Sequence, residues 1–82
     1  MTIVKAVALR TTQLMIKKDM NAYKVAIKAM IPHSTLFNIL NELHKDINLS
    51  TIYRLAYAFN MDILEFLNDD VFKKVDIIKE LA

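Results

Sequence analysis

The sequence predicts a single all-α domain of about five helices followed by an amphipathic extension. Apolar residues recur at helical spacing along almost the whole chain, and no stretch shows the sustained apolar/polar alternation of a half-buried strand. Capping residues and the one proline divide this pattern into separate segments. With 82 residues, the chain has room for one domain, whose core must use nearly every apolar residue available.

The first predicted helix covers Ile3 to Lys18. Its lysines and its one arginine, Arg10, fall largely outside the apolar stripe, and the lysines near its end suit the negative pole of a helix. A second, shorter helix is predicted from Ala22 to Ala29, because the side chain of Asn21 can accept a hydrogen bond from an amide in its first turn. The apolar stripe of the first helix consists of Val4, Val7, Leu14 and Met15.

A third helix is predicted from Pro32 to Asn41. Proline is disfavoured inside a helix but suits the first turn, where its missing N–H would have had no partner. The stretch from Glu42 to Ile47 has poor periodicity and is predicted to be a loop. Either Asn48 or Ser50 then caps a fourth helix. The residues expected on its inner face are Ile52, Leu55, Ala56 and Phe59.

The fifth helix is predicted to open at Asp62, because Glu65 follows three residues later with the spacing of a capping box. Asn60 before it can take the left-handed conformation that often ends a helix. Residues 71–82 are predicted to form a C-terminal amphipathic extension, which either folds back on the core or pairs with a second copy. Its apolar face consists of Val71, Phe72, Val75, Ile78 and Leu81.

Composition excludes several kinds of chemistry. Without cysteine there is no disulfide framework and no thiolate site, so a reducing cytoplasm is the expected compartment. Without glycine there is no glycine-rich phosphate cradle and no nucleophile elbow. We therefore expect no enzyme and no cofactor. The five methionines, at helical spacing, are expected to fill the core.

Neither a metal site nor a membrane span is expected. His33 and His44 lie eleven residues apart without a third ligand at helical spacing. The longest unbroken apolar run, Leu55 to Phe59, is too short to cross a bilayer. The N-terminal stretch also lacks the apolar segment of a secretory signal.

The charge of the chain is divided unevenly. Residues 1–54 hold eight lysines and arginines against three acidic residues, whereas residues 55–82 hold three against six. The first part is therefore the one expected to meet a polyanion, although a solvated basic face is the simpler interpretation of charge alone.

The two short helices around Met30-Ile31-Pro32 have the spacing of a helix-turn-helix, over about residues 22–41. Ala26 is small, as closely crossing helices require, and its neighbours in the motif are apolar. Further similarity lies in Val25-Ala26, Ser34-Thr35-Leu36, Asn38 to Asn41, Ile52 to Phe59 and Met61 to Leu67. On these residues the chain resembles the lambda-repressor and Cro-like family, also called the xenobiotic response element family, of transcription regulators.

The resemblance implies a five-helix lambda-repressor-like domain that binds double-stranded DNA with the helix from Pro32 to Asn41 in the major groove. Members typically bind two-fold operators as homodimers. The base-contacting residues that it implies are His33, Ser34, Phe37 and Asn38. The DNA-backbone contacts that it implies are Asn21, Tyr23, Lys24, Thr35, Asn41, Lys45 and Asn48. For the dimer we expect Val71, Phe72, Val75 and Ile78 at or near the contact.

The chain departs from the family pattern where glycine is usual, because Met30, Glu42 and Asn60 stand at those turns. Either Met30 and Glu42 are strained or their turns differ from those of the family. The predicted recognition helix also carries no lysine or arginine. Two functions are therefore expected: a DNA-binding regulator, with repression favoured, or a protein-interaction module on the same fold, antitoxin-like or anti-regulator, that docks through Phe37.

Overall fold

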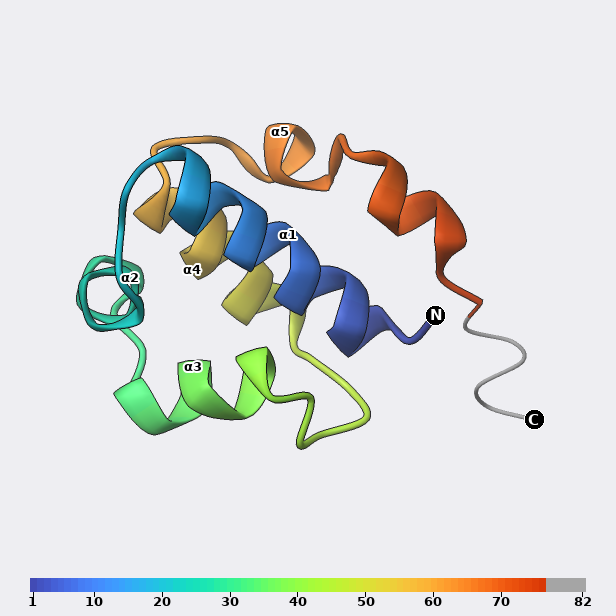
Figure 1. Ribbon diagram of the computed structural model, residues 1–82, viewed down its shortest axis with the longest axis horizontal. Helices are drawn as coiled ribbons and strands as arrows, with labels where there is room; N and C mark the ends of the chain where they lie inside the picture. Colours follow the sequence, from blue (N-terminus) through green and yellow to red (C-terminus); the bar gives the residue numbers. More distant parts are fainter. Residues whose placement is uncertain (77–82) are drawn as a thin grey trace.

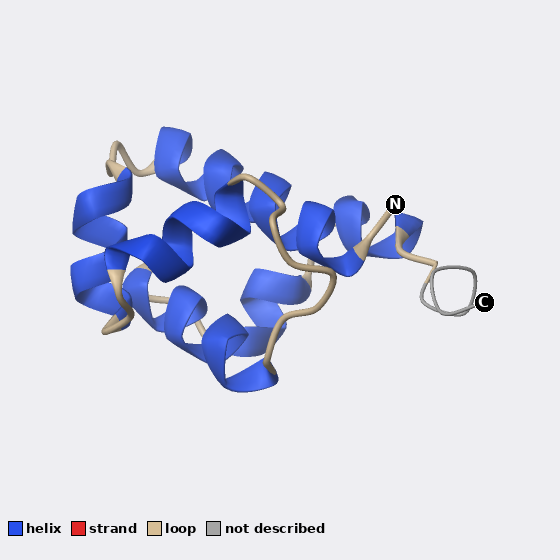
Figure 2. Ribbon diagram, turned by 90° about the horizontal axis from the view of Figure 1, so that it is seen from below, coloured by secondary structure: helices blue, strands red, loops and turns tan. Residues whose placement is uncertain are grey.

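The computed structural model of the chain describes residues 1–76, and every regular element in that range is helical (Figures 1 and 2). The predicted all-α fold class is confirmed. Among the described helices, none is long and apolar enough to cross a membrane. The elements are α1 (Ile3–Lys17), α2 (Ala22–Ala29), α3 (His33–Leu40), α4 (Leu49–Ala58), α5 (Ile63–Leu67) and the 3-10 helix η1 (Asp70–Lys74).

The helices enclose one apolar core, to which each of α1 to α5 contributes. Figure 1 shows α1 across the middle of the molecule, α3 along its lower edge and α5 above. The inner face predicted for the fourth helix is confirmed, because its four predicted residues are buried, three of them in α4 and Phe59 as its C-cap. Each large side chain in this core stabilises the fold by about 1.5–3 kcal/mol. The largest apolar side chains that are fully buried are Phe59, Phe66, Leu14, Leu36, Leu55, Val4, Val7 and Val25.

The predicted helix starts are largely confirmed. The side-chain oxygen of Asn21 accepts a hydrogen bond from the Lys24 amide at 2.8 Å, and that of Asp62 accepts one from the Glu65 amide at 2.8 Å. Asn48, rather than Ser50, is the N-cap of α4, without a side-chain capping bond to the described residues. Pro32 is the N-cap of α3 and not its first helical residue, so this boundary was predicted one residue too early.

Within residues 1–76, four residues adopt the left-handed conformation, at the ends of helices or in the turns after them. Met30, Glu42 and Asn60 have φ angles of 57°, 56° and 58°, so the turns keep the geometry for which glycine is usual. The left-handed conformation of Asn60 was predicted. Asp19, with φ of 52°, was not. For residues with a Cβ atom this conformation is unfavourable by about 1–2 kcal/mol, and less for asparagine and aspartate.

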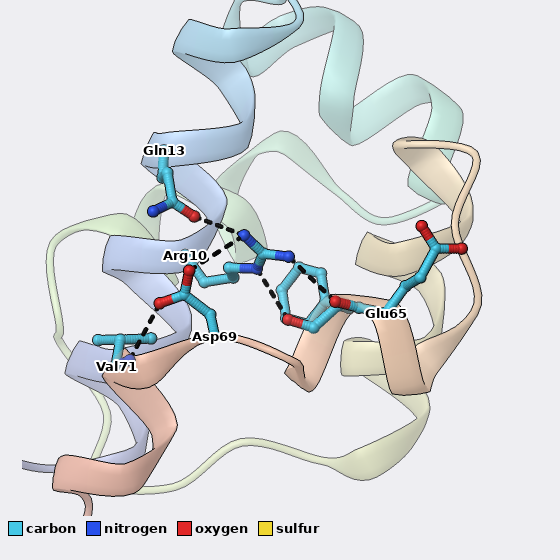
Figure 3. Close-up of polar contacts among 6 residues, drawn as sticks. Arg10, Gln13, Glu65, Asp69 and Val71 are labelled. Carbon is cyan, nitrogen blue, oxygen red and sulfur yellow. Dashed lines mark hydrogen bonds and ion pairs between the residues drawn. The ribbon is translucent and has the colours of Figure 1, made fainter.

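Arg10 ties α1 to the end of α5 and to the segment that follows (Figure 3). Its Nε donates to the carbonyl of Phe66 at 2.8 Å and its Nη2 to that of Glu65 at 3.0 Å. Its Nη1 lies 3.4 Å from a carboxylate oxygen of Asp69 and also donates to Gln13. The prediction that Arg10 lies largely outside the apolar stripe of α1 is therefore wrong. Its side chain packs against the end of α5, where its guanidinium donates to two backbone carbonyls.

Asp69 begins η1 and faces Arg10. Its carboxylate accepts a hydrogen bond from the backbone N–H of Val71 at 3.0 Å. This bond lowers the pKa of the Asp69 carboxyl below its ordinary value of 3.8, and the positive charge of Arg10 acts in the same direction. The charged form of Asp69 is thus the one that the fold stabilises.

The C-terminal extension differs from a continuous amphipathic stripe. It begins as a 3-10 helix, and Val75 is extended, because the Asp69 cap starts a tight turn rather than an α-helix. The Phe72 ring packs on the core of its own chain, with its centroid 6.1 Å from that of Phe66. Val71 and Val75 are half-buried. The predicted positions Ile78 and Leu81 lie outside the described residues.

The methionines divide between core and surface. Met15, Met20 and Met61 pack against the buried cluster, as predicted. Met30 is 67% exposed and Met1 is exposed, so the prediction of core filling is wrong for these two. For Met30 the reason is the left-handed turn, which directs its side chain to the surface.

Candidate nucleic-acid interface

The helices α2 and α3 form the predicted helix-turn-helix. The Ile31 amide donates to the carbonyl of Ala26 at 3.1 Å, and the Met30 amide donates to that of Ile27 at 3.1 Å. With Met30 in the left-handed conformation, these bonds close α2 with a Schellman-type end. The turn therefore has the motif's geometry without glycine. The buried residues that hold the two helices on the core are Val25, Ala26, Ala29, Leu36 and Ile39.

The outer face of α3 presents most of the predicted base-contacting residues. His33, Ser34 and Phe37 are exposed, and Asn38 is half-buried. The phenyl ring of Phe37 is prominent, since the residue is 54% exposed in the middle of the helix. Leu36 and Ile39 are buried, so one face of α3 packs on the core and the opposite face is accessible to a partner.

Asn38 has a partner that sequence analysis did not assign to it. Its Nδ2 lies 3.4 Å from Nε2 of His44, which belongs to the loop after α3. A depression of about 220 Å³ between α3 and this loop is lined by Asn38 and His44 together with the predicted backbone-contacting residues Thr35 and Asn48. Asp46 lines it too. The spacing of six residues across a helix end was the available signal for the Asn38–His44 pair.

His33 also has a neighbour, in α2. The ring centroids of Tyr23 and His33 lie 5.4 Å apart, and the rings are inclined by 44°. Aromatic rings attract one another in such tilted arrangements. The contact links the first turn of α2 to the first turn of α3 and brings a predicted base-contacting residue beside a predicted backbone-contacting one.

The remaining residues predicted to contact the DNA backbone lie before and after α3 in the sequence. Lys24 and Lys45 are exposed. Two of the asparagines have local roles: Asn21 caps α2, and Nδ2 of Asn41 donates to the carbonyl of Phe37 at 2.8 Å. Each amide keeps groups free for another partner, since asparagine carries two donor hydrogens and an acceptor oxygen.

The charge of this surface comes from its flanks. The helix α3 carries no lysine, arginine, aspartate or glutamate, and the exposed Glu42 follows its C-cap. Within residues 1–76, no group of three or more His, Cys, Asp or Glu residues is placed to hold a metal ion. The surface is therefore built for hydrogen bonding and apolar contact, with lysines around it.

Comparison with known families identifies this architecture. The family model of the Cro/C1-type HTH DNA-binding domain matches residues 12–70, which span the C-terminal part of α1, the helix-turn-helix, α4 and α5. No curated protein and no solved structure matches the chain. The agreement of the matched range with the observed helices means that the chain belongs to the family of Cro/C1-type helix-turn-helix DNA-binding domains.

Proposed function

We propose that this protein is a sequence-specific transcription regulator of the cytoplasm, and specifically a repressor, that acts by occupying a DNA operator rather than by catalysis. The observation that carries the proposal is the orientation of α3. Its buried residues Leu36 and Ile39 fix it to the core, and His33, Ser34 and Phe37 are exposed on the opposite side. An α-helix presented in this way fits the major groove.

The proposed base contacts follow from the chemistry of the side chains. The amide of Asn38 can accept from N6 and donate to N7 of adenine, and its second N–H remains available for His44. His33 and Ser34 can donate or accept at a base edge. Phe37 offers an apolar surface to a thymine methyl group. These four residues form the proposed reading surface.

The proposed phosphate contacts surround that surface. Lys24 and Lys45, on opposite sides of α3 in the sequence, supply positive charge that α3 lacks. Contacts of this kind set the position of the protein and most of its salt dependence, without reading sequence. The polar residues proposed to assist them are Asn21, Tyr23, Thr35, Asn41 and Asn48.

We further propose that the active form is a homodimer. Two copies would read half-sites about one helical turn of DNA apart, or a multiple of it. The half-buried Val71 and Val75 support a contact near the C-terminal extension, whereas Phe72 is engaged with its own core. Ile78 stays part of the proposal on its sequence position alone.

A selection from random duplex DNA at about 0.1 M salt tests the proposal, because specificity must be separated from salt-dependent non-specific binding. The expected result is one enriched motif with two-fold symmetry, which the protein binds more tightly than scrambled duplex. Enrichment of a single half-site would retain the regulator and reject the dimer. Weak binding to all duplexes without enrichment would reject sequence-specific regulation.

A protein-interaction module on the same fold is the second candidate. It is favoured by the exposed ring of Phe37 on a helix without lysine or arginine, since aromatic residues are common in protein interfaces. An antitoxin-like or anti-regulator role would then be expected. A stoichiometric complex with a purified protein, unaffected by excess duplex DNA and lost in Phe37→Ala, would support this candidate over the first.

A further inference from the structure

A shallow apolar groove lies between the end of α2 and α4. It has a volume of about 490 Å³ and is lined by Met30, Ser50, Tyr53, Arg54 and Tyr57. None of these residues is among the proposed DNA contacts. Tyr53 and Tyr57 stand one turn apart on α4 and are 54% and 66% exposed. The groove thus offers two aromatic rings and a methionine to solvent.

Met30 is the unusual member of this groove. It has φ of 57° and ψ of 42°, a conformation that is unfavourable for methionine, and its side chain is mostly exposed. In the domain alone, the strain is therefore not offset by burial of the side chain. The turn at the end of α2 sets this conformation, and the result is an apolar side chain in solvent beside the groove. Methionine also adapts its shape to apolar partners.

The charge around the groove has one sign. Arg54 lines it, and its Nη1 donates to the carbonyl of Met30 at 3.3 Å. A second depression adjoins it through Met30 and Tyr57 and contains Lys28. Among the described residues that line the two depressions, there is no carboxylate, and neither α2 nor α4 contains an acidic residue.

This charge distribution selects the occupant. A two-fold contact would place this groove against the same groove of a second copy. Arg54 and Lys28 would then face the arginine and lysine of that copy, without a carboxylate to pair with. An acidic partner would instead meet complementary charge. An added strand has no sheet edge to join, because the described residues are all helical or loop. An amphipathic helix is the peptide form that fits an apolar groove of this kind.

We propose that this groove binds an acidic amphipathic helix of a partner protein. Apolar side chains of that helix contact Met30, Tyr53 and Tyr57. Its carboxylates pair with Arg54 and Lys28. The groove uses no residue of α3 and none of the proposed DNA contacts, so it gives the domain a second candidate binding surface.

A displayed library of helices about four turns long tests this inference. Apolar residues vary at anchor positions i, i+4 and i+7, and the flanking positions vary among Glu, Lys and Ala. Selection uses the full chain without DNA. We expect enrichment of helices with Glu at the flanks. No enrichment, or enrichment of Lys flanks, would overturn the proposal.

The enriched helices, made as labelled peptides, are then titrated against variants. Arg54→Glu is expected to weaken binding by about tenfold or more, which corresponds to about 1.4 kcal/mol. Met30→Gly is expected to weaken it by at least about fivefold, because the apolar anchor is lost. Glycine suits the left-handed turn, so this variant keeps the fold, and a thermal melt on the same sample checks that it does.

Two control variants separate this surface from other effects. Leu64→Ala removes an exposed leucine of α5 outside the groove and should leave peptide affinity unchanged. Asn38→Ala should also leave it unchanged, so failure of the DNA proposal and failure of this one are distinguishable. Equal affinity of wild type, Arg54→Glu and Met30→Gly would overturn the proposal. Self-association of the chain that competes with peptide and is lost in Met30→Gly would overturn it in favour of a second copy.

Discussion

The side-chain amide of Asn38 lies 3.4 Å from Nε2 of His44, so the residue proposed to read adenine is steadied by the loop that follows its helix. A neutral imidazole with its lone pair on Nε2 accepts one amide hydrogen. The other hydrogen and the oxygen of the amide then remain available for a base. His44 acts in this arrangement as a positioning residue for Asn38.

The first prediction concerns this pair. Asn38→Ala is expected to remove the preference at one base position, by about 1–3 kcal/mol, because a bidentate contact is lost. His44→Ala should reduce the same preference by less, since the amide remains but is no longer held. Competition binding with duplexes changed at each position measures both effects.

A loss that is equal on every duplex would contradict the assignment of Asn38 to base reading. Replacement of His44 by glutamine provides the matched control. Its amide can accept the same hydrogen bond, so it should restore part of the preference that alanine removes.

The second prediction concerns the lysines at the flanks of α3. Lys24→Ala and Lys45→Ala should each weaken binding to specific and scrambled duplexes alike. Each should also make the negative slope of log K against log salt shallower, by about 1. A titration over salt concentration measures the slope. Lys73→Ala, at an exposed residue of η1 that no proposed contact uses, should leave it unchanged.

The third prediction concerns the left-handed residues. Met30→Gly and Glu42→Gly should each raise the free energy of unfolding by about 0.5–1 kcal/mol, because relief of strain exceeds the added entropy of the unfolded chain. Urea unfolding followed by circular dichroism measures this change. Asn60→Gly is the control and should change stability less, since asparagine tolerates positive φ. Destabilisation by Met30→Gly would show that its side chain contributes to packing.

Much of this fold could be predicted because its signals are local. Asn21 and Asp62 cap helices within three residues of themselves, and the inner face of α4 follows from spacing alone. Asn60 was predicted in the left-handed conformation for the same reason. For Met30 and Glu42 the sequence left two alternatives, a strained residue or a different turn, because a Cβ atom opposes the left-handed conformation that the turns adopt.

The rest depended on contacts between distant residues. Nothing near Arg10 in the sequence indicates that its guanidinium meets the carbonyls of Glu65 and Phe66. The break in the predicted stripe at Val75 follows from the Asp69 cap and from packing of Phe72 on Phe66. The placement of α3 shows which of its residues are exposed. Their contacts with DNA stay predictions.

The fourth prediction tests the Arg10 anchor. Arg10→Met keeps an apolar stem of similar length but removes the donors to two carbonyls, so it should lower the free energy of unfolding by about 2 kcal/mol. Arg10→Lys, which keeps one charged donor group, should lose less. The measurement is again urea unfolding. Equal stability of wild type and Arg10→Met would show that water replaces these bonds without loss.

The fifth prediction is a pH dependence that comes from Asp69. Because its pKa is lowered in the folded state, its contribution is present above the ordinary value of 3.8 and is lost as the pH falls through the folded pKa. Asp69→Asn keeps an acceptor for the Val71 amide but removes the charge. The variant should be less stable than wild type at pH 7, and the difference should shrink below about pH 4.

Asp70→Asn is the matched control for this experiment. Asp70 pairs with Lys73 at 3.3 Å, but both side chains are almost fully exposed, and such pairs contribute little. Its replacement should leave stability nearly unchanged at pH 7. A difference between wild type and Asp69→Asn that stays constant from pH 7 to pH 3 would contradict the role given to the charge.

The hydrogen bond from Arg10 to Phe66 spans 56 residues of sequence, whereas α2 and α3 meet across a short turn. Closing a long loop has a larger entropic penalty than closing a short one. We therefore expect the helix-turn-helix to form early in folding and the docking of α5 and η1 on α1 to come late. Mutations at Arg10 should then accelerate unfolding while leaving the folding rate almost unaltered, the kinetic signature of a contact absent from the transition state.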